Sequence, residues 1–262
     1  MINLKYLDTL KIINKYQTKF IAHRGLSGLE KENTMCAFVS AGARSYYGVE
    51  CDIHKTKDGK YVVCHDSNVK RVSGIDANIN TLTYEEISNI HLIDNFDNIK
   101  KPFLTIPLFE DYLDCMKKYN KYCVIELKDE FSDDDISIIL NHINLRNYKD
   151  KCIIISFSLT NLVKVRQVDR TIKMQYLVSG YSKAVLENCV KYNMSLDIDY
   201  TFLTKQIIDD FHKYGLEVNA WTINDSDEAI RFIDYGIDYI TTNILEYNKE
   251  IYISLFFCFR IW

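Results

Sequence analysis

The alternation of short apolar segments with longer segments of helical periodicity most constrains how this chain can fold. Several short segments are continuously apolar, as is typical of parallel strands buried on both faces. The longer segments are amphipathic and have the length of helices. The predicted strands are residues 18–22, 48–54, 122–127, 152–157, 173–178, 194–199, 217–223 and 237–241. The predicted helices are residues 109–119, 133–146, 159–168, 182–192, 204–214 and 225–235.

Strands that alternate with helices in this way predict a parallel sheet in an α/β protein. At about 250 residues, eight such strands are most economically closed into a (β/α)8 TIM barrel. An open, doubly wound sheet is the alternative, but no GxGxxG motif follows the first strand, which disfavours its dinucleotide-binding form. Gly215 and Gly236 follow two of the predicted helices, where a left-handed residue often ends a helix.

One stretch departs from the alternation and predicts an insertion after the second strand. Residues 57–59 suggest a tight turn, and residues 61–64 a strand that returns from it. Residues 83–86 form a capping-box sequence that would begin a short helix. We interpret 67–106 as a small insertion in a single barrel domain that spans residues 1–250.

The last twelve residues, 251–262, are almost wholly apolar. They are too few to span a bilayer as a helix, which needs about 20 residues. We interpret them as an apolar tail that packs on the body of the protein or contacts a membrane surface.

Composition limits the class of protein. The net charge of −4 does not favour a nucleic-acid partner, and no CxxC pair occurs among the eight cysteines, which we expect to be reduced thiols. The N-terminal residues lack the pattern of a secretory signal, so we expect a cytoplasmic protein, with residues 251–262 as a candidate membrane contact.

Charged side chains cluster where predicted strands end, which is where barrel enzymes place their active sites. Residues that alternate along a strand share one face, so paired positions should converge. The residues concerned are His23, Arg24, Glu50, Asp52, His65, Glu126 and Lys128.

This set of side chains predicts a metal-dependent phosphate site. Three converging carboxylates repel one another unless a hard cation such as Ca²⁺ or Mg²⁺ binds them. The two cationic side chains would then hold a phosphate, and the two histidines would exchange protons. Alternatively, the carboxylates only pair with the cations, and the histidines have structural roles. We interpret His54 as a supporting residue, and Asp197 and Asp199 as solvated or paired.

The motifs, taken in order, resemble those of the glycerophosphodiester phosphodiesterase family from about residue 18 to residue 243. The matching motifs are FIAHRG at 20–25, ENT at 32–34, VECDI at 49–53, TKDG at 56–59, VVCHD at 62–66, IP at 106–107, IELK at 125–128, SF at 156–157, AWTIN at 220–224 and GIDYITTN at 236–243. Two positions differ, because the family usually has a proline where Lys31 stands and an aspartate where Asn243 stands.

The resemblance implies the barrel fold and a role for each matching residue. His23 and His65 would be the acid/base pair, and Glu50, Asp52 and Glu126 would bind the metal ion. By the same resemblance, Arg24 and Lys128 would contact the phosphate, and Phe157 and Trp221 would line the substrate pocket.

The implied reaction is the metal-dependent hydrolysis of a small glycerophosphodiester to sn-glycerol 3-phosphate and an alcohol. An alternative substrate is a lysophospholipid or a glycerol-phosphate polymer at a membrane surface. A barrel that binds phosphodiesters or a partner protein without turnover is the non-enzymatic alternative.

Overall fold

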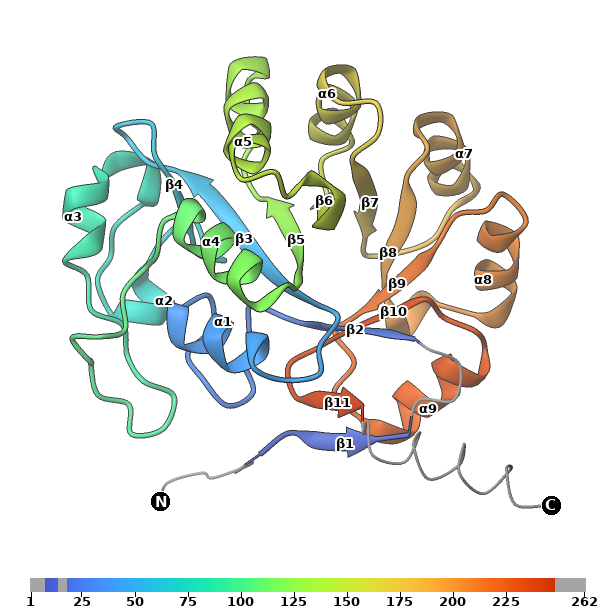
Figure 1. The fold of residues 1–262 in the computed structure, drawn as a ribbon, viewed down its shortest axis with the longest axis horizontal. Helices are drawn as coiled ribbons and strands as arrows, with labels where there is room; N and C mark the ends of the chain where they lie inside the picture. The colour runs from blue at the N-terminus through green and yellow to red at the C-terminus, as the bar shows by residue number, and fades with distance from the viewer. Residues whose placement is uncertain (1–7, 14–17, 248–262) are drawn as a thin grey trace.

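Eight parallel strands form a closed barrel at the centre of the molecule (Figure 1). The computed structural model describes residues 8–13 and 18–247. The barrel closes because β2 pairs with both β10 and β3. The barrel strands are β2 (Lys19–Ala22), β3 (Gly48–Lys55), β5 (Tyr122–Leu127), β6 (Cys152–Ser156), β7 (Lys173–Val178), β8 (Ser195–Asp199), β9 (Val218–Trp221) and β10 (Tyr239–Thr242). The predicted TIM barrel is therefore confirmed.

Helices follow the strands and surround the barrel (Figure 1). They are α1 (Met35–Gly42), α4 (Phe109–Tyr119), α5 (Asp133–Leu145), α6 (Leu159–Val168), α7 (Lys183–Tyr192), α8 (Lys205–His212) and α9 (Ser226–Asp234), with short 3₁₀ turns at η2 (Lys149–Lys151) and η3 (Tyr200–Phe202). Their apolar sides pack against the outer faces of the strands in one large core. Gly215 and Gly236 have the expected positive φ angles, 69° and 83°.

Helix α1 and the strands β1 and β11 were not predicted from the sequence. Helix α1 is eight residues long, and Thr34 accepts a hydrogen bond from Ala37 N at its start. Strands β1 (Leu10–Ile12) and β11 (Leu245–Tyr247) pair in parallel as a separate sheet. This sheet lies between α9 and α1 (Figure 1). Within the described residues, no helix follows β10. Residues 251–262, expected to form an apolar tail, lie outside the described residues.

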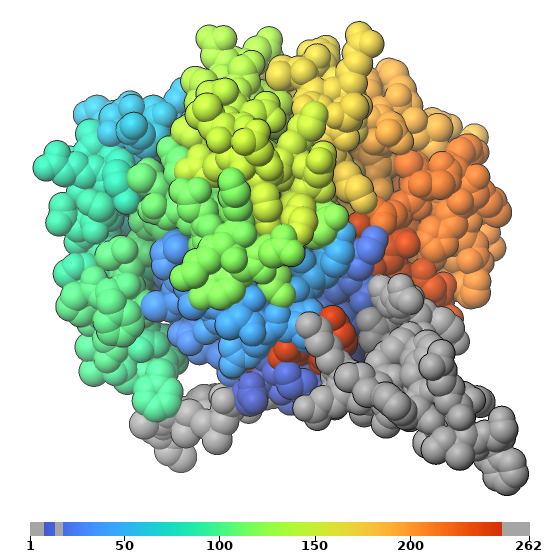
Figure 2. Space-filling model, in the orientation of Figure 1, coloured from blue at the N-terminus to red at the C-terminus, as the bar shows by residue number. Residues whose placement is uncertain are grey.

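The stretch interpreted as an insertion has its own small apolar core. The turn at 57–59 leads into β4 (Tyr61–Val63), which pairs antiparallel with β3 as predicted. The following residues contain α2 (Lys70–Ser73), η1 (Ile79–Thr81) and α3 (Tyr84–Ser88), and the capping box at Thr83 is present. Their apolar side chains gather around Val62 and Cys64. In Figure 2, this stretch occupies one flank of the molecule, coloured teal to green.

The period of two along each strand decides which side chains face the centre of the barrel. On β3, residues Val49, Cys51 and Ile53 belong to the core shared with the helices. The intervening residues, Glu50 and Asp52, therefore face the opposite side, inside the barrel. The fold thus directs carboxylates inward from a strand that is buried along nearly its whole length.

Candidate active site

Three carboxylates meet inside the barrel where β3 and β5 run side by side. The strand register places Asp52 directly beside Glu126, and Glu50 lies two residues earlier on the same face of β3. One oxygen from each side chain lies within 4.8 Å of the others. All three side chains are buried. The three residues form a group that can hold a metal ion.

Electrostatics within this group favour a bound cation. Burial, together with the charges of Asp52 and Glu126, raises the pKa of Glu50 well above its ordinary value. Burial and Asp52 likewise raise the pKa of Glu126. Burial acts in the same direction on Asp52, but Lys128 and Arg24 hold its pKa below the ordinary value. Without a cation, the site therefore disfavours full ionisation of all three carboxylates.

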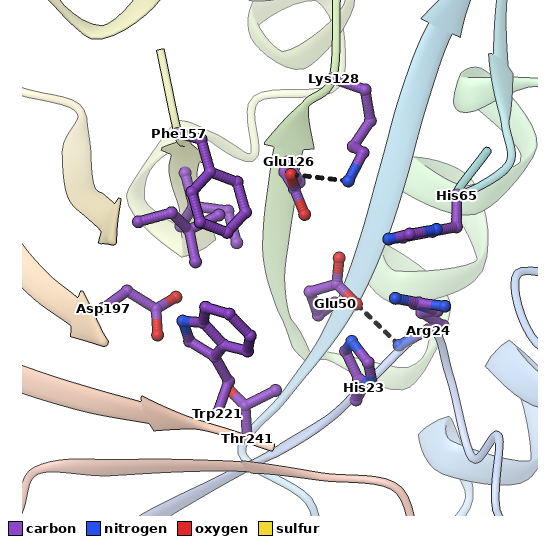
Figure 3. A pocket seen from close by; sticks show the side chains of 12 residues that line it. His23, Arg24, Glu50, His65, Glu126, Lys128, Phe157, Asp197, Trp221 and Thr241 are labelled. Carbon is purple, nitrogen blue, oxygen red and sulfur yellow. Dashed lines mark hydrogen bonds and ion pairs between the residues drawn. The ribbon is translucent and has the colours of Figure 1, made fainter. Parts of the chain in front are cut away.

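Two cationic side chains lie beside the carboxylates. The Nζ atom of Lys128 is 2.9 Å from Glu126 Oε1 and 3.6 Å from Asp52 Oδ1. The Nε atom of Arg24 is 3.5 Å from Asp52 Oδ2, and its buried N–H has no hydrogen-bond acceptor. These positions place positive charge at the border of the pocket drawn in Figure 3.

His23 follows β2 in the turn that brings this strand to the site. Its Nδ1 lies 2.7 Å from Asn243 Oδ1, so Nδ1–H donates to the amide oxygen and Nε2 is left with a lone pair. Burial and the charge of Arg24 lower the pKa of His23 to about 4. Its imidazole is therefore neutral at pH 7.

His65 follows β4 and borders the pocket beside Arg24 (Figure 3). Its Nδ1 lies 2.6 Å from Asp66 Oδ1, which fixes the ring and favours a proton on it. Burial and the charge of Arg24 lower the pKa of His65 below its ordinary value, although the charge of Asp52 and the hydrogen bond to Asp66 oppose that effect. The two histidines thus have different partners, a neutral amide and a carboxylate.

His54 supports the backbone at His65, in line with the supporting role expected from the sequence. Its Nδ1 lies 2.7 Å from Asp129 Oδ1, and its Nε2 lies 3.1 Å from the carbonyl oxygen of His65. Burial opposes a charge on His54, but the hydrogen bond to Asp129 raises its pKa above the ordinary value. This buried imidazole connects β5 to the segment that carries His65.

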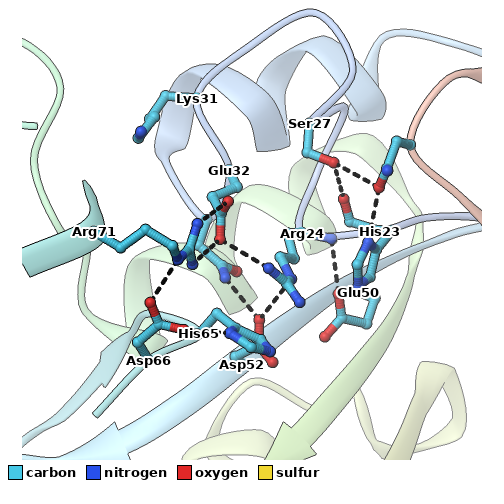
Figure 4. Close-up of polar contacts among 12 residues, drawn as sticks. His23, Arg24, Ser27, Lys31, Glu32, Glu50, Asp52, His65, Asp66 and Arg71 are labelled. Carbon is cyan, nitrogen blue, oxygen red and sulfur yellow. Dashed lines mark hydrogen bonds and ion pairs between the residues drawn. The ribbon is translucent and has the colours of Figure 1, made fainter. Parts of the chain in front are cut away.

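Each residue of the Glu-Asn-Thr motif makes a separate contact, and Figure 4 shows Glu32 beside Arg24. Glu32 binds Arg24 at 3.0 Å, Asn33 Nδ2 donates to Asp52 Oδ2 at 2.7 Å, and Thr34 caps α1. Arg24 has a positive φ of 54°, and its backbone N–H donates to Glu50. The motif therefore orients both a cation and a carboxylate of the site.

Arg71, on α2, extends this network to the insertion (Figure 4). Its guanidinium binds both oxygens of Glu32 at 2.8 Å and Asp66 Oδ2 at 2.6 Å. Glu32 forms an ion pair with Arg24, and Asp66 forms a hydrogen bond with His65. Arg71 therefore links the two carboxylates that position these pocket residues. Burial opposes ionisation of Glu32, but Arg71 and Arg24 lower its pKa to about 2.

Aromatic side chains border the other part of the pocket. The rings of Phe157 and Trp221 pack edge to face with centroids 5.7 Å apart, and Phe157 is 45% exposed. The residues that line the pocket are His23, Arg24, Glu50, His65, Glu126, Lys128, Ile155, Phe157, Leu177, Asp197, Trp221 and Thr241. Eight of the nine side chains predicted to form the site line this pocket, and the ninth, Asp52, forms ion pairs with two of them, Arg24 and Lys128.

The sequence model of the glycerophosphoryl diester phosphodiesterase family matches residues 23–246. The chain belongs to this family. A glycerophosphodiester phosphodiesterase of Bacillus subtilis is 27% identical over 85% of this chain and 82% of its own length. A human lysophospholipase D is 26% identical over 87% of this chain and 84% of its own length.

A solved structure of an Oleispira antarctica phosphodiesterase in complex with the product sn-glycerol 3-phosphate has the same fold. Its TM-score is 0.81 at 25% identity, and the match covers 87% of this chain and 94% of that chain. The prediction of an enzyme of the glycerophosphoryl diester phosphodiesterase family is confirmed. Within residues 8–13 and 18–247, no helix is long and apolar enough to cross a membrane.

Several residues around the pocket had no assigned role from the sequence. Glu32 and Asn33 belong to a motif that was visible, but its contacts were not. Arg71 and Asp129 gave no signal, since each acts through residues distant in the sequence. Asp197, expected to be solvated or paired, is not solvated, because the residue is 2% exposed; it has a side-chain hydrogen bond with Asn219, whereas its Oδ1 has no hydrogen-bond partner.

Proposed function

We propose that this member of the glycerophosphoryl diester phosphodiesterase family hydrolyses glycerophosphodiesters to sn-glycerol 3-phosphate and an alcohol. The observation that carries the proposal is the convergence of two histidines, three carboxylates and two cations on one pocket inside the barrel. Each kind of side chain has a use in phosphodiester hydrolysis, and the family membership supports the reaction class.

The chemistry of the donor set fits a hard divalent cation. Glu50 Oε1 and Asp52 Oδ1 are buried oxygens without a hydrogen-bond partner, and they lie in the group that Glu126 completes. Oxygen-only ligands are those that Ca²⁺ and Mg²⁺ prefer. When bound, such an ion would neutralise the carboxylates and stabilise negative charge on the phosphate oxygens.

Arg24 and Lys128 are proposed to bind the phosphate group. Both remain cationic, since the neighbouring carboxylates raise the pKa of each against the effect of burial. They border the pocket next to the carboxylates, so a phosphate would lie between them and the metal ligands. Charge that grows on the phosphate oxygens in the transition state would be stabilised there.

The two histidines are proposed to divide the proton transfers. His23 is neutral and has a free Nε2, so it would accept the proton of the attacking hydroxyl group. His65 has the carboxylate of Asp66 behind its ring, which would stabilise the protonated ring against the pKa-lowering effect of burial, so His65 would donate a proton to the leaving alkoxide. As the new P–O bond forms, the bond to the leaving alcohol breaks, and the two transferred protons balance.

Replacing either histidine with alanine tests the proposal. We expect the release of glycerol 3-phosphate from glycerophosphocholine, with Mg²⁺ or Ca²⁺ present, to fall by about 10²- to 10⁴-fold in H23A and H65A. The matched control is H212A, because His212 pairs with Asp238 outside the pocket. A near-normal kcat in H23A or H65A would contradict the proposed roles, and no product from any glycerophosphodiester would contradict the reaction.

A lysophospholipid is the second candidate substrate, because one of the relatives is a lysophospholipase D. Comparing turnover of glycerophosphocholine and lysophosphatidylcholine distinguishes the two. If the apolar residues 251–262 bring the protein to lipid surfaces, a variant that ends at residue 250 should lose vesicle binding and keep its activity on glycerophosphocholine. Equal vesicle binding by both proteins would exclude the membrane role for residues 251–262.

A further inference from the structure

The backbone of His65 is held in place by a side chain from the neighbouring strand. His65 lies in a bend after β4, and no backbone N–H of the described residues donates to its carbonyl oxygen. His54 Nε2, from β3, lies 3.1 Å from that oxygen. The ring of His65 is held separately, through the contact of its Nδ1 with Asp66. This pocket residue therefore has one anchor on its side chain and another on its backbone.

Both ring nitrogens of His54 face a hydrogen-bond acceptor. Nδ1 lies 2.7 Å from Asp129 Oδ1, and Nε2 faces the carbonyl oxygen of His65. His54 is 4% exposed, so both contacts are shielded from solvent. Because an imidazole that is bonded at both nitrogens has a fixed orientation, His54 relates the position of Asp129 to that of the His65 backbone.

Asp129 is itself fixed by two neighbouring elements. Its Oδ2 accepts a hydrogen bond from the backbone N–H of Lys55 at 3.0 Å. Its carbonyl oxygen accepts from Asn161 Nδ2 at 2.7 Å, and the Oδ1 of the same amide accepts from Phe131 N at 3.1 Å. Asn161 is fully buried on α6. The carboxylate that holds His54 therefore has a defined position relative to β3 and α6.

We propose that His54, held by Asp129, is a positioning residue for the proton donor of the reaction. The inference rests on the proposed function, in which His65 gives a proton to the leaving oxygen as the bond between that oxygen and phosphorus breaks. This transfer needs a donor within about 2.6–3.2 Å of the leaving oxygen. A displacement of about 1 Å can cost about 100-fold in rate. His54 does not line the pocket and acts through His65.

The leaving group distinguishes positioning of the proton donor from general support of the fold. Choline is a poor leaving group and needs a proton as it departs from glycerophosphocholine. In sn-glycerol 3-(4-nitrophenyl) phosphate, 4-nitrophenol departs as a stable phenolate and needs none. Both substrates carry the same glycerol phosphate. Loss of an aligned proton donor should therefore slow the first reaction and spare the second, whereas a general structural defect should slow both alike.

The test compares kcat on the two substrates with Mg²⁺ present. H54F retains a planar ring without N–H groups, and we expect it to lower kcat about 10- to 100-fold on glycerophosphocholine and about threefold or less on the nitrophenyl ester. D129A should act in the same direction by a smaller factor. The side chain of Asp129 is 35% exposed, so D129A should fold even if H54F does not. H65A should show the same selectivity with a larger loss.

The matched control is the pair formed by His212 and Asp238. Its ring nitrogen and carboxylate oxygen are 2.8 Å apart, Asp238 also accepts from a backbone N–H, and neither residue lines the pocket. H212F and D238A should leave the ratio of the two kcat values unchanged. Thermal unfolding identifies the folded variants. Equal losses on both substrates, or no loss, in folded H54F or D129A would overturn the positioning role. If H65A slowed both substrates alike, the proton-donor role within the proposed function would fail instead.

Discussion

Replacing Glu50 with glutamine should make the metal-free protein more stable and remove most of its stabilisation by metal. Glu50 is 3% exposed, its Oε1 has no partner, and burial with the charges of Asp52 and Glu126 raises its pKa. The folded protein therefore disfavours the charged form, and metal-free stability should fall as the pH rises through that raised pKa. Glutamine retains an oxygen for the Arg24 backbone N–H but carries no charge, so E50Q should avoid this loss.

The size of the metal effect follows from mass action. A cation present at 100 times its dissociation constant stabilises the folded state by about 2.7 kcal/mol. In a chain of this length, that corresponds to a rise in Tm of about 5 to 11 °C. If losing one carboxylate ligand weakens binding about 100-fold, the same ion concentration would give about 0.4 kcal/mol. The rise in Tm should then shrink to about 1 to 2 °C.

Differential scanning fluorimetry with Mg²⁺, with Ca²⁺ and with a chelator measures both effects. The matched control is E246Q, because Glu246 is equally buried, at 3% exposure, but accepts hydrogen bonds from Thr9 and Ser45 far from the pocket. E246Q should lose stability without metal and retain the full metal-induced rise. If E50Q showed the wild-type rise, or a lower Tm in chelator, the reasoning about the carboxylate group would be refuted.

Three further predictions concern the supports of the histidines and of Arg24. R71A should lower kcat about tenfold with little change in Tm, because Asp66 and Glu32 lose their shared partner; an unchanged kcat would exclude this positioning role. Ionised Glu32, with its pKa lowered from 4.5 to about 2, stabilises the fold above pH 4.5, and this contribution is lost as the pH falls toward 2. The Tm of E32Q should therefore fall less than that of the wild type between pH 6 and pH 3, and parallel curves would contradict the role of this ion pair. N243D should raise the pKa of His23 and move the acidic limb of kcat/KM to higher pH, whereas an unmoved limb would argue against His23 as the base.

The sequence predicted the barrel well because its signals are local. Continuous apolar strands and amphipathic helices report burial within a few residues, and most predicted bounds lie within two residues of those observed. Helix α1 was missed although Thr34 and the glutamate-asparagine pair before it were visible. Strands β1 and β11 are three residues each and pair across more than 200 positions, so no local pattern could predict them.

The sequence predicted the residues of the candidate site that lie in recognisable motifs. It did not predict the residues that join the site only through tertiary contacts. Alternation on β3 placed Glu50 and Asp52 on one face, and the structure adds that Glu126 is the register partner of Asp52. Asp197 occupies the same kind of alternating position on β8. Its burial beside Trp221 depends on the closed barrel, which brings residues from different strands into one pocket. The sequence of one strand alone does not show that these residues are neighbours. A carboxylate on a barrel strand is therefore interpretable only once its face and its depth are known.

Residues 67–106, which we interpret as an insertion, help to support the site, and Lys31, which departs from the family pattern, strengthens that connection. Lys31 is buried, and its Nζ lies 3.3 Å from Asn95 Oδ1, while Asn95 Nδ2 donates to the carbonyl oxygen of Glu30. A proline at position 31 has no amine to make this contact. The next residue, Glu32, binds Arg71 of the insertion, so two successive side chains attach the loop after His23 to residues 67–106. Because that loop also orients Arg24, movement of residues 67–106 would be transmitted to the end of the pocket where Arg24 lies.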